Sequence, residues 1–282
     1  SSRRRHTRYG TVTGVQTCAL PICGIRTGTQ DLAPFRPARS AYIHVPFCRR
    51  RCDYCDFTLV VGRNGMVGRY LAALERDLER LTEPVEVDTL FLGGGTPTHL
   101  ETGDLQRLMT LLCRWFRLTP SAEFSVEANP LDLLDESRVE VLRAAGVNRV
   151  SIGAQSFQDK ELHLLSRDHR GDDVCEAVAR VQRWIPNVSL DLIFGVPGQS
   201  WDSWRENLDR ALALAPSHLS TYGLTIEKGT RFWSLTQSGR LRTVPEDLES
   251  RMYELAMDLL PSRGFHQYEL SNFAQPGWQC RH

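Results

Sequence analysis

The sequence predicts an α/β fold whose core is an open (β/α)6 barrel, a partial TIM-like barrel. Strand-like and helix-like patterns alternate six times from Ser40 onward, and the strand-like runs are almost continuously apolar. Such runs are typical of parallel strands that helices cover. A full eight-stranded barrel or a doubly wound sheet is the alternative. In all of these folds, ligands bind at the C-terminal ends of the strands.

Each predicted unit pairs one apolar run with one amphipathic helix. The predicted strands are Ala41–Val45, Val87–Leu92, Glu123–Glu127, Arg149–Gly153, Ser189–Phe194 and Leu219–Thr225. The predicted helices are Tyr70–Leu81, Asp104–Phe116, Glu136–Ala145, Asp172–Trp184 and Ser203–Ala213. A polar turn over 227–233, a helix from Pro245 to about Leu260 and a strand over Phe265–Leu270 are expected to follow. We therefore expect a barrel core over 40–226 and an extension of it over 227–282.

The first 23 residues do not resemble a natural protein segment. Ser2–Arg8 and Val12–Ile22 match translations of parts of a common short-read sequencing adapter, so we expect residues 1–23 to be a disordered artefact. The alternatives are a basic nucleic-acid-binding arm and a targeting peptide, but the latter would need an apolar segment of ~7–15 residues. Residues 24–39 are a short lead-in. The artefact carries four arginines and no acids, so the remainder has a net charge of −4 and gives no reason to expect nucleic-acid binding.

Composition limits the remaining classes. The chain has 282 residues, of which 41% are hydrophobic and 24% charged, which suits one large soluble domain or two small ones. No apolar run approaches the ~18 residues that an integral membrane segment needs. Three of the eight cysteines share one short loop, and Cys113 and Cys175 fit helical patterns, where we expect them to be buried core thiols. A reducing compartment, the cytoplasm, is therefore expected rather than secretion.

Three cysteines directly follow the first predicted strand. Cys48, Cys52 and Cys55 have the spacing C-x3-C-x2-C. Three thiolates on one loop can hold three irons of a 4Fe–4S cluster and leave the fourth iron open to a small chelating molecule. Zinc is the alternative, because clustered cysteines often bind it. Zinc usually takes two separated pairs of ligands, however, and no second pair follows downstream.

Two further groups of candidate residues follow the second and third predicted strands. Gly94, Gly95 and Thr96 belong to a glycine-rich loop whose backbone can approach a ligand without a Cβ in the way, although such loops also form simple tight turns. The loop lacks G-K-[ST], so it is not a P-loop. Glu127 ends the third strand, where barrel carboxylates are often functional. The alternative for Glu127 is a surface charge or an ion pair.

Later strand ends add an amide, a carboxylate and a guanidinium. Gln155 and Asp191 follow two neighbouring predicted strands, which favours a shared ligand over two buried hydrogen-bonding spacers. Arg167 could neutralise a ligand carboxylate by a bidentate contact, although on its own it would be assigned to a solvated helix face.

Together these segments resemble the radical S-adenosylmethionine (radical SAM) superfamily. The strings that carry the resemblance are H-V-P-F-C-x3-C-x-Y-C-D-F, G-G-G-T-P-T, V-E-A-N-P, S-I-G-A-Q-S-F, D-L-I-F-G-V-P-G-Q and L-S-N-F-A. The resemblance covers about Ser40 to His282. It implies a 4Fe–4S cluster on the three cysteines and S-adenosylmethionine on the open iron. It also implies that an electron from the cluster cleaves the sulfonium.

The resemblance also implies roles for individual residues. The glycine loop with Gly94, Gly95 and Thr96 would hold the methionyl amino group, and Glu127 would bind the ribose hydroxyls. The other cofactor-binding positions that it implies are Tyr42, Tyr54, Gln155, Arg167 and Asp191. Of these, Tyr54 would shield the cluster or contact the adenine.

Within the superfamily, the strings are closest to a group that contains the HemW-type haem chaperones and the oxygen-independent coproporphyrinogen III dehydrogenases. The dehydrogenases carry a fourth cysteine in C-x2-C-x-C, where this chain has Phe57, and a longer N-terminal segment than residues 24–40. Both differences favour the chaperones. The resemblance then implies a haem or porphyrin ligand, an unidentified acceptor protein and a reductant for the cluster. It also implies truncation before a small C-terminal domain. The alternative is coproporphyrinogen III oxidation in porphyrin biosynthesis.

Overall fold

The computed structural model describes residues 38–282, so the predicted adapter segment and most of the lead-in lie outside the described residues. One eight-stranded sheet dominates this part of the chain, with strand order β1-β4-β5-β6-β7-β8-β10-β9. The first six strands run parallel: β1 (Ser40–Val45), β4 (Val85–Gly94), β5 (Phe116–Ala128), β6 (Arg149–Gln155), β7 (Asn187–Phe194) and β8 (His218–Gly223). The predicted partial (β/α)6 barrel is confirmed. The domain boundary at residue 226 stays a prediction.

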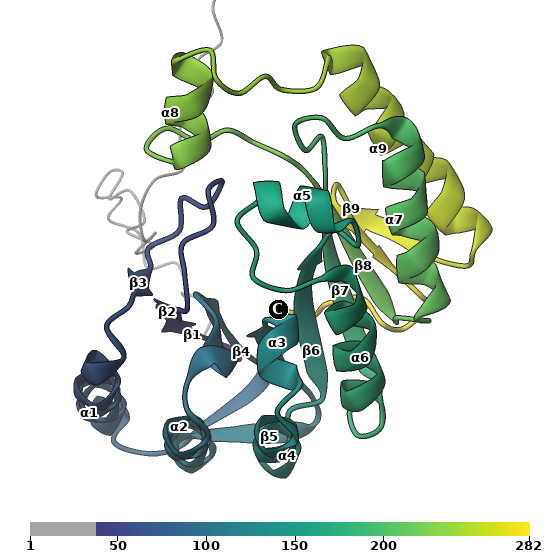
Figure 1. The fold of residues 1–282 in the computed structure, drawn as a ribbon. Helices are drawn as coiled ribbons and strands as arrows, with labels where there is room; N and C mark the ends of the chain where they lie inside the picture. Colours follow the sequence, from purple (N-terminus) through teal and green to yellow (C-terminus); the bar gives the residue numbers. More distant parts are fainter. Residues whose placement is uncertain (1–37) are drawn as a thin grey trace, which may run out of the picture. The chain divides into compact units, whose positions relative to one another are not determined.

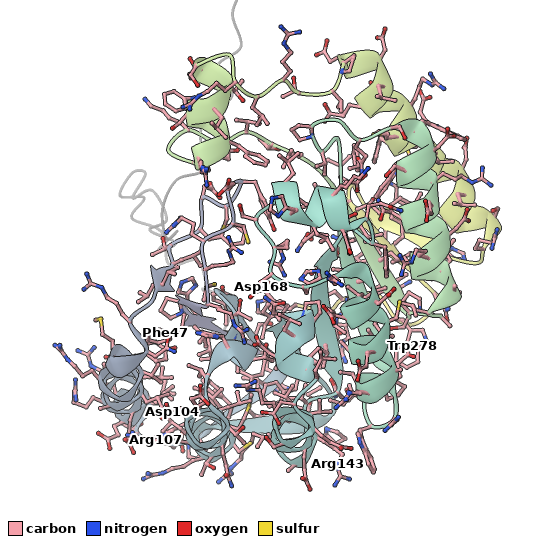
Figure 2. The ribbon with its side chains drawn as sticks, viewed as in Figure 1. Phe47, Asp104, Arg107, Arg143, Asp168 and Trp278 are labelled. Carbon is pink, nitrogen blue, oxygen red and sulfur yellow. The ribbon has the colours of Figure 1, made fainter. Side chains whose placement is uncertain are left out.

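Helices connect the parallel strands. They are α1 (Val67–Leu78), α2 (Thr102–Trp115), α3 (Pro130–Leu133), α4 (Glu136–Ala144), α5 (Asp159–Leu164), α6 (Gly171–Gln182) and α7 (Trp201–Ala213). In Figure 1, α1, α2, α4, α6 and α7 follow one another along the outer side of the sheet. Figure 2 shows Arg107 and Arg143 projecting from this helical layer on the side away from the strands.

The two faces of the sheet differ in chemistry because successive side chains of a strand point to opposite faces. The face under the helices is apolar and belongs to the main core, as Val126, Val150 and Leu190 illustrate. The inner face of strands β5 to β8 is polar along most of its length. Its buried polar members are Glu123, Ser125, Arg149, Asn187, Ser189, His218 and Ser220. Sheet and helices therefore share an apolar layer, whereas the inside of the half-barrel is held by hydrogen bonds.

The last part of the chain returns to the sheet. Helix α9 (Glu246–Ser262) precedes β9 (His266–Glu269) and β10 (Asn272–Ala274), and β10 pairs antiparallel with both β8 and β9. The terminal residues then run along the inner face: the backbone N–H of Arg281 donates to Glu123 (3.2 Å), and the His282 ring stacks on Phe91 (4.8 Å). No helix among residues 38–282 is long and apolar enough to cross a membrane.

Several elements differ from the sequence prediction, helix α8 (Arg231–Gln237) and strand β10 among them. The polar turn expected over 227–233 ends at Thr230, where helix α8 begins. The Thr230 hydroxyl accepts a hydrogen bond from the Trp233 backbone N–H (3.1 Å), and Phe232 is fully buried, so capping and burial favour a helix despite its polar sequence. Strand β10 was not predicted, because three residues carry too little periodicity to be recognised.

Candidate cluster and cofactor site

The cysteine loop is anchored where β1 ends. Pro46 separates β1 from the short strand β2 (Phe47–Cys48), which pairs with β3 (Val60–Val61). Residues 49–59 form the loop between them, and a turn hydrogen bond joins the Cys55 N–H to the Cys52 carbonyl (3.1 Å). At its far side, the Phe232 N–H of α8 donates to the Asp53 carbonyl (2.9 Å). The loop is thus held at both its base and its tip.

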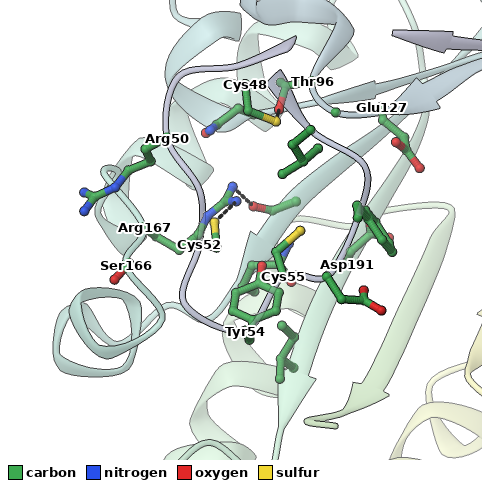
Figure 3. Close-up of a pocket in the computed structure, with 18 of the residues that line it drawn as sticks. Cys48, Arg50, Cys52, Tyr54, Cys55, Thr96, Glu127, Ser166, Arg167 and Asp191 are labelled. Carbon is green, nitrogen blue, oxygen red and sulfur yellow. Dashed lines mark hydrogen bonds between the residues drawn. The ribbon is translucent and has the colours of Figure 1, made fainter. Parts of the chain in front are cut away.

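A pocket of about 390 Å³ opens between this loop and the C-terminal ends of the strands. It collects all the predicted site residues except Tyr42. Those that line it are Cys48, Cys52, Tyr54, Cys55, Gly94, Gly95, Thr96, Glu127, Gln155, Arg167 and Asp191. Figure 3 shows the three sulfurs around this pocket, with Glu127 and Asp191 to their right and Asp191 beside Cys55. Residues from five separate segments of the sequence therefore meet at the expected edge of the barrel.

Two of the three sulfurs already have polar neighbours. The Cys48 Sγ lies 3.4 Å from the Thr96 hydroxyl, and the Cys52 Sγ accepts a hydrogen bond from Arg167 (3.5 Å). Burial raises the pKa of Cys48 to about 11, and it also raises the pKa of Cys55. Without a metal these thiols are protonated at neutral pH, so loading the site releases protons.

The glycine loop packs against the base of the cysteine loop. The Gly95 N–H donates to the Val45 carbonyl and the Thr96 N–H to the Phe47 carbonyl, both at 2.8 Å. A Cβ on Gly95 would lie 2.7 Å from backbone atoms of Val45 and Pro46, so only glycine fits there. Gly94 adopts a φ of +105°, and its N–H donates to the Glu127 Oε2 (2.8 Å). The Thr96 carbonyl accepts from the His99 N–H (2.9 Å), which starts the turn that follows the loop.

Glu127 is a half-buried carboxyl group at the end of β5. Burial raises its pKa from the ordinary 4.5 to about 7, the charge on Asp191 adds to the shift, and the hydrogen bond from Gly94 opposes it. A carboxylate in this position accepts hydrogen bonds strongly, since little water competes for it. It is suited to bind a pair of ligand hydroxyls.

This shift makes the stability of the ligand-free protein depend on pH. Because the folded protein holds the Glu127 proton where the unfolded chain has released it, stability falls as pH rises from about 4.5 to about 7. We expect the wild type to lose on the order of 2–3 kcal/mol relative to Glu127→Gln between pH 5 and 8 in urea unfolding. Glu140→Gln, an exposed change on α4, is the control and should show no such trend. A pH-independent difference between wild type and Glu127→Gln would contradict the prediction.

Arg167, Asp191 and Gln155 complete the pocket wall. Arg167 donates to the Gly153 carbonyl (2.9 Å) as well as to Cys52, while its Nε is buried and has no partner among the described residues. The Ser151 hydroxyl lies 3.1 Å from each Asp191 carboxylate oxygen, and burial raises the pKa of Asp191. Gln155 adopts a φ of +64°, which is uncommon outside glycine. Strain at a strand end facing a pocket is typical of ligand sites.

The two predicted tyrosines lie in different places. Tyr54 lines the pocket and packs against a second apolar cluster that includes Ile193 and Phe232. Tyr42 lies on the inner face, is 49% exposed, and its hydroxyl is 3.2 Å from the His44 Nδ1. His44 in turn contacts the Thr58 carbonyl (3.2 Å), so Tyr42 and His44 support the end of the cysteine loop.

Several pocket residues escaped the sequence analysis, Asn129, Asp168 and Tyr222 among them. Asn129 and Asp168 line the pocket, and each has a buried side-chain oxygen without a hydrogen-bond partner in the described part of the chain. Tyr222, at the end of β8, is 44% exposed and lines it as well. Asn129 stands two positions after Glu127 and Asp168 directly after Arg167, so proximity to predicted site residues was the available signal.

The donor set fits a cubane cluster with an open iron. Three thiols converge on one pocket from a single loop, and buried polar atoms without partners face the same space. Within residues 38–282, no three Cys, His, Asp or Glu side chains lie close enough together to bind a single metal ion. A 4Fe–4S cluster is larger than one ion, so its thiolate ligands lie farther apart. When bound, such a cluster supplies a low-potential electron. The protein's own residues position the ligands, orient Cys52 through Arg167 and exclude water around Glu127.

An open barrel with this cysteine loop at its mouth defines an iron–sulfur protein of the radical SAM class, and comparison with known families agrees. The radical SAM superfamily profile matches residues 42–211. The chain therefore belongs to the radical SAM superfamily.

Individual proteins are similar to this chain over most of its length. The chain is 42% identical over 251 residues to the haem chaperone HemW of Bacillus subtilis, which covers 86% of this chain and 65% of that protein. It is 35% identical to radical S-adenosyl methionine domain-containing protein 1, mitochondrial, of Bos taurus, covering 90% of this chain and 60% of that protein. This chain thus spans less than two thirds of the length of these relatives.

Solved structures show the same fold. Coproporphyrinogen III oxidase (HemN) from Escherichia coli, a radical SAM enzyme, superposes with a TM-score of 0.77 at 27% identity, covering 87% of this chain and 57% of that one. SuiB of Streptococcus suis, solved bound to S-adenosylmethionine, superposes with a TM-score of 0.55 at 16% identity and shows likeness of fold alone.

Proposed function

We propose that this protein is a haem chaperone of the HemW type, which holds a 4Fe–4S cluster and S-adenosylmethionine and transfers haem to an acceptor protein. The observation that carries the proposal is the 42% identity to a haem chaperone HemW over a region that includes the whole described pocket. Phe57, which stands where the related dehydrogenases carry a fourth cysteine, supports it and is 59% exposed at the pocket.

In this proposal, each part of the pocket has one task. Cys48, Cys52 and Cys55 bind three irons. The glycine loop with Gly94, Gly95 and Thr96 holds the methionyl ammonium, and Arg167 pairs with the methionyl carboxylate, which satisfies its unpartnered Nε. Glu127 accepts from the ribose hydroxyls, while Gln155, Asp191 and Tyr54 bound the nucleoside. Tyr42 acts through His44, at the base of the loop.

The alternative function is oxidation of coproporphyrinogen III. Its support is the likeness to the Escherichia coli enzyme, whose TM-score of 0.77 extends over 87% of this chain. Both functions need the same cluster, so the cysteine loop does not distinguish them. The difference lies in whether porphyrin is carried or converted.

The test is an anaerobic reconstitution followed by two measurements. Haem titration, followed by optical absorbance, should show one haem bound per chain. Incubation with coproporphyrinogen III, S-adenosylmethionine and a reductant should give no protoporphyrinogen. Turnover in the second assay would overturn the chaperone assignment in favour of the oxidase.

We further propose a reducing compartment, the cytoplasm, as the place of action. The six cysteines within the described residues are all free thiols, as a thiolate-bound cluster requires. The reductant for the cluster and the haem acceptor are partners that this proposal requires.

A further inference from the structure

Three consecutive arginines separate Cys48 from Cys52, and they have different surroundings. Arg51 stays within the loop and donates to the carbonyls of Cys55 (3.2 Å) and Phe57 (3.4 Å). Arg50 makes no ion pair with the described residues, and Figure 3 shows it pointing away from the sulfurs. Arg49 instead forms ion pairs with Asp132 (3.4 Å) and Asp168 (3.7 Å), which follow two different strands.

The carboxylates of Asp132 and Asp168 are largely buried, so each is stabilised by a nearby cation. The Asp132 side chain is only 3% exposed, and its other oxygen accepts from the Thr98 hydroxyl (3.2 Å). The Asp168 Oδ2 is buried and has no hydrogen-bond partner in the described chain, so Arg49 is the cation that faces it. Figure 2 places Asp168 at the pocket end of the sheet. Such pairs matter more than exposed surface pairs, because breaking them leaves a desolvated charge.

These contacts connect the cysteine loop to one neighbouring segment at two points. Arg49 adjoins Cys48 in sequence and pairs with Asp168, while the neighbouring Arg167 donates to the Cys52 sulfur (3.5 Å). The adjacent residues Arg167 and Asp168 thus contact both ends of the segment from Cys48 to Cys52: Asp168 pairs with Arg49, and Arg167 donates to Cys52. They follow Ser166, whose φ of +58° fixes the turn that presents them.

We propose that Arg49 is a positioning residue that pre-organises the cysteine loop before the cluster binds, by fixing the separation of Cys48 and Cys52 through Asp132 and Asp168. The inference rests on the cluster site of the proposed function. Without this ion pair the loop must be ordered when the iron binds, and the lost conformational freedom then opposes loading.

The test compares Arg49→Ala with Arg50→Ala, which removes the same charge from the same loop. In the metal-free protein, amide hydrogen exchange over residues 48–57 should be about tenfold faster in Arg49→Ala than in the wild type, because the loop opens more often once the Arg49 anchor is removed. Arg50→Ala should exchange like the wild type, and Arg49→Lys should be intermediate. Asp168→Asn tests the same contact from the other side and should also speed exchange.

A second measurement separates this role from general stability. Cluster incorporation, followed by the electron paramagnetic resonance signal of the reduced protein, should be slower in Arg49→Ala than in Arg50→Ala when both variants are assayed well below their melting temperatures. If Arg49→Ala and Arg50→Ala exchange and load alike while the wild type binds its cluster, the positioning role is overturned. If the wild type binds no cluster at all, the cluster assignment itself is overturned.

Discussion

Replacing Cys52 with serine is expected to abolish the 4Fe–4S cluster. A serine hydroxyl is a hard, weakly acidic ligand that substitutes poorly for a thiolate on iron. Two remaining thiolates would leave two irons open on a loop that has no other cysteine. Anaerobic reconstitution followed by iron and sulfide analysis measures the loss, and Cys48→Ser and Cys55→Ser should behave in the same way.

Cys113→Ser is the matched control, because Cys113 lies on α2, outside the pocket. The expectation that Cys113 is a buried core thiol was wrong: the residue is exposed, since it lies on the side of α2 away from the core. The Cys113→Ser variant should retain full cluster content. If the Cys52→Ser variant kept the iron and sulfide content of the Cys113→Ser control, the cluster would have to lie elsewhere. Zinc in the reconstituted wild type, in place of iron and sulfide, would equally contradict the assignment.

Glu161→Ala is expected to cost about 3–5 kcal/mol of folding stability, the largest effect of any change outside the pocket proposed here. The buried Glu161 carboxylate accepts hydrogen bonds from Ser156 (2.6 Å), Gln199 (2.9 Å), Asn207 (2.9 Å) and the Ser203 hydroxyl. It therefore joins the segment after β6, the segment after β7 and helix α7. Removing it leaves several buried donors unpaired, each of which carries a desolvation cost.

Chemical unfolding with urea measures this loss, with Glu140→Ala on the exposed face of α4 as the control. The stability of Glu161→Gln should lie between those of Glu161→Ala and Glu140→Ala. The amide keeps the side-chain volume, but its NH2 group is a donor where the carboxylate oxygen accepted hydrogen bonds from other donors. A Glu161→Ala variant within about 1 kcal/mol of Glu140→Ala would show that the carboxylate does not organise these segments.

Much of the fold could be read from the chain, because strands covered by helices on one face keep an apolar residue at least at every second position. All six parallel strands fall on predicted segments. The N-terminal part of β5 was missed: its exposed Pro120 and Ser121 resemble a loop, and pairing with β4 extends the strand through them. Helix α8 was missed for a similar reason, since the burial of Phe232 depends on contacts far away in sequence.

The pocket residues were predictable where chemistry and position coincide, as for Glu127 at a strand end. The supporting residues were not. Ser156 and Gln199 stand in two of the recognised strings, yet the structure assigns them to the Glu161 network rather than to a ligand. Glu161 itself lies in an ordinary helical sequence. Arg49 was hidden in a run of three arginines, and only the tertiary positions of Asp132 and Asp168 distinguish it.

The polar inner face of the half-barrel has an evolutionary consequence. Stability resides mainly in the apolar layer between sheet and helices, so inner-face residues that line the pocket, such as Ser151 and Tyr222, can be exchanged for others without dismantling the scaffold. Mutations there would change which ligand the pocket binds while the chain still folds. One ancestral framework could in this way give rise both to catalysts that transform a guest and to carriers that merely deliver it.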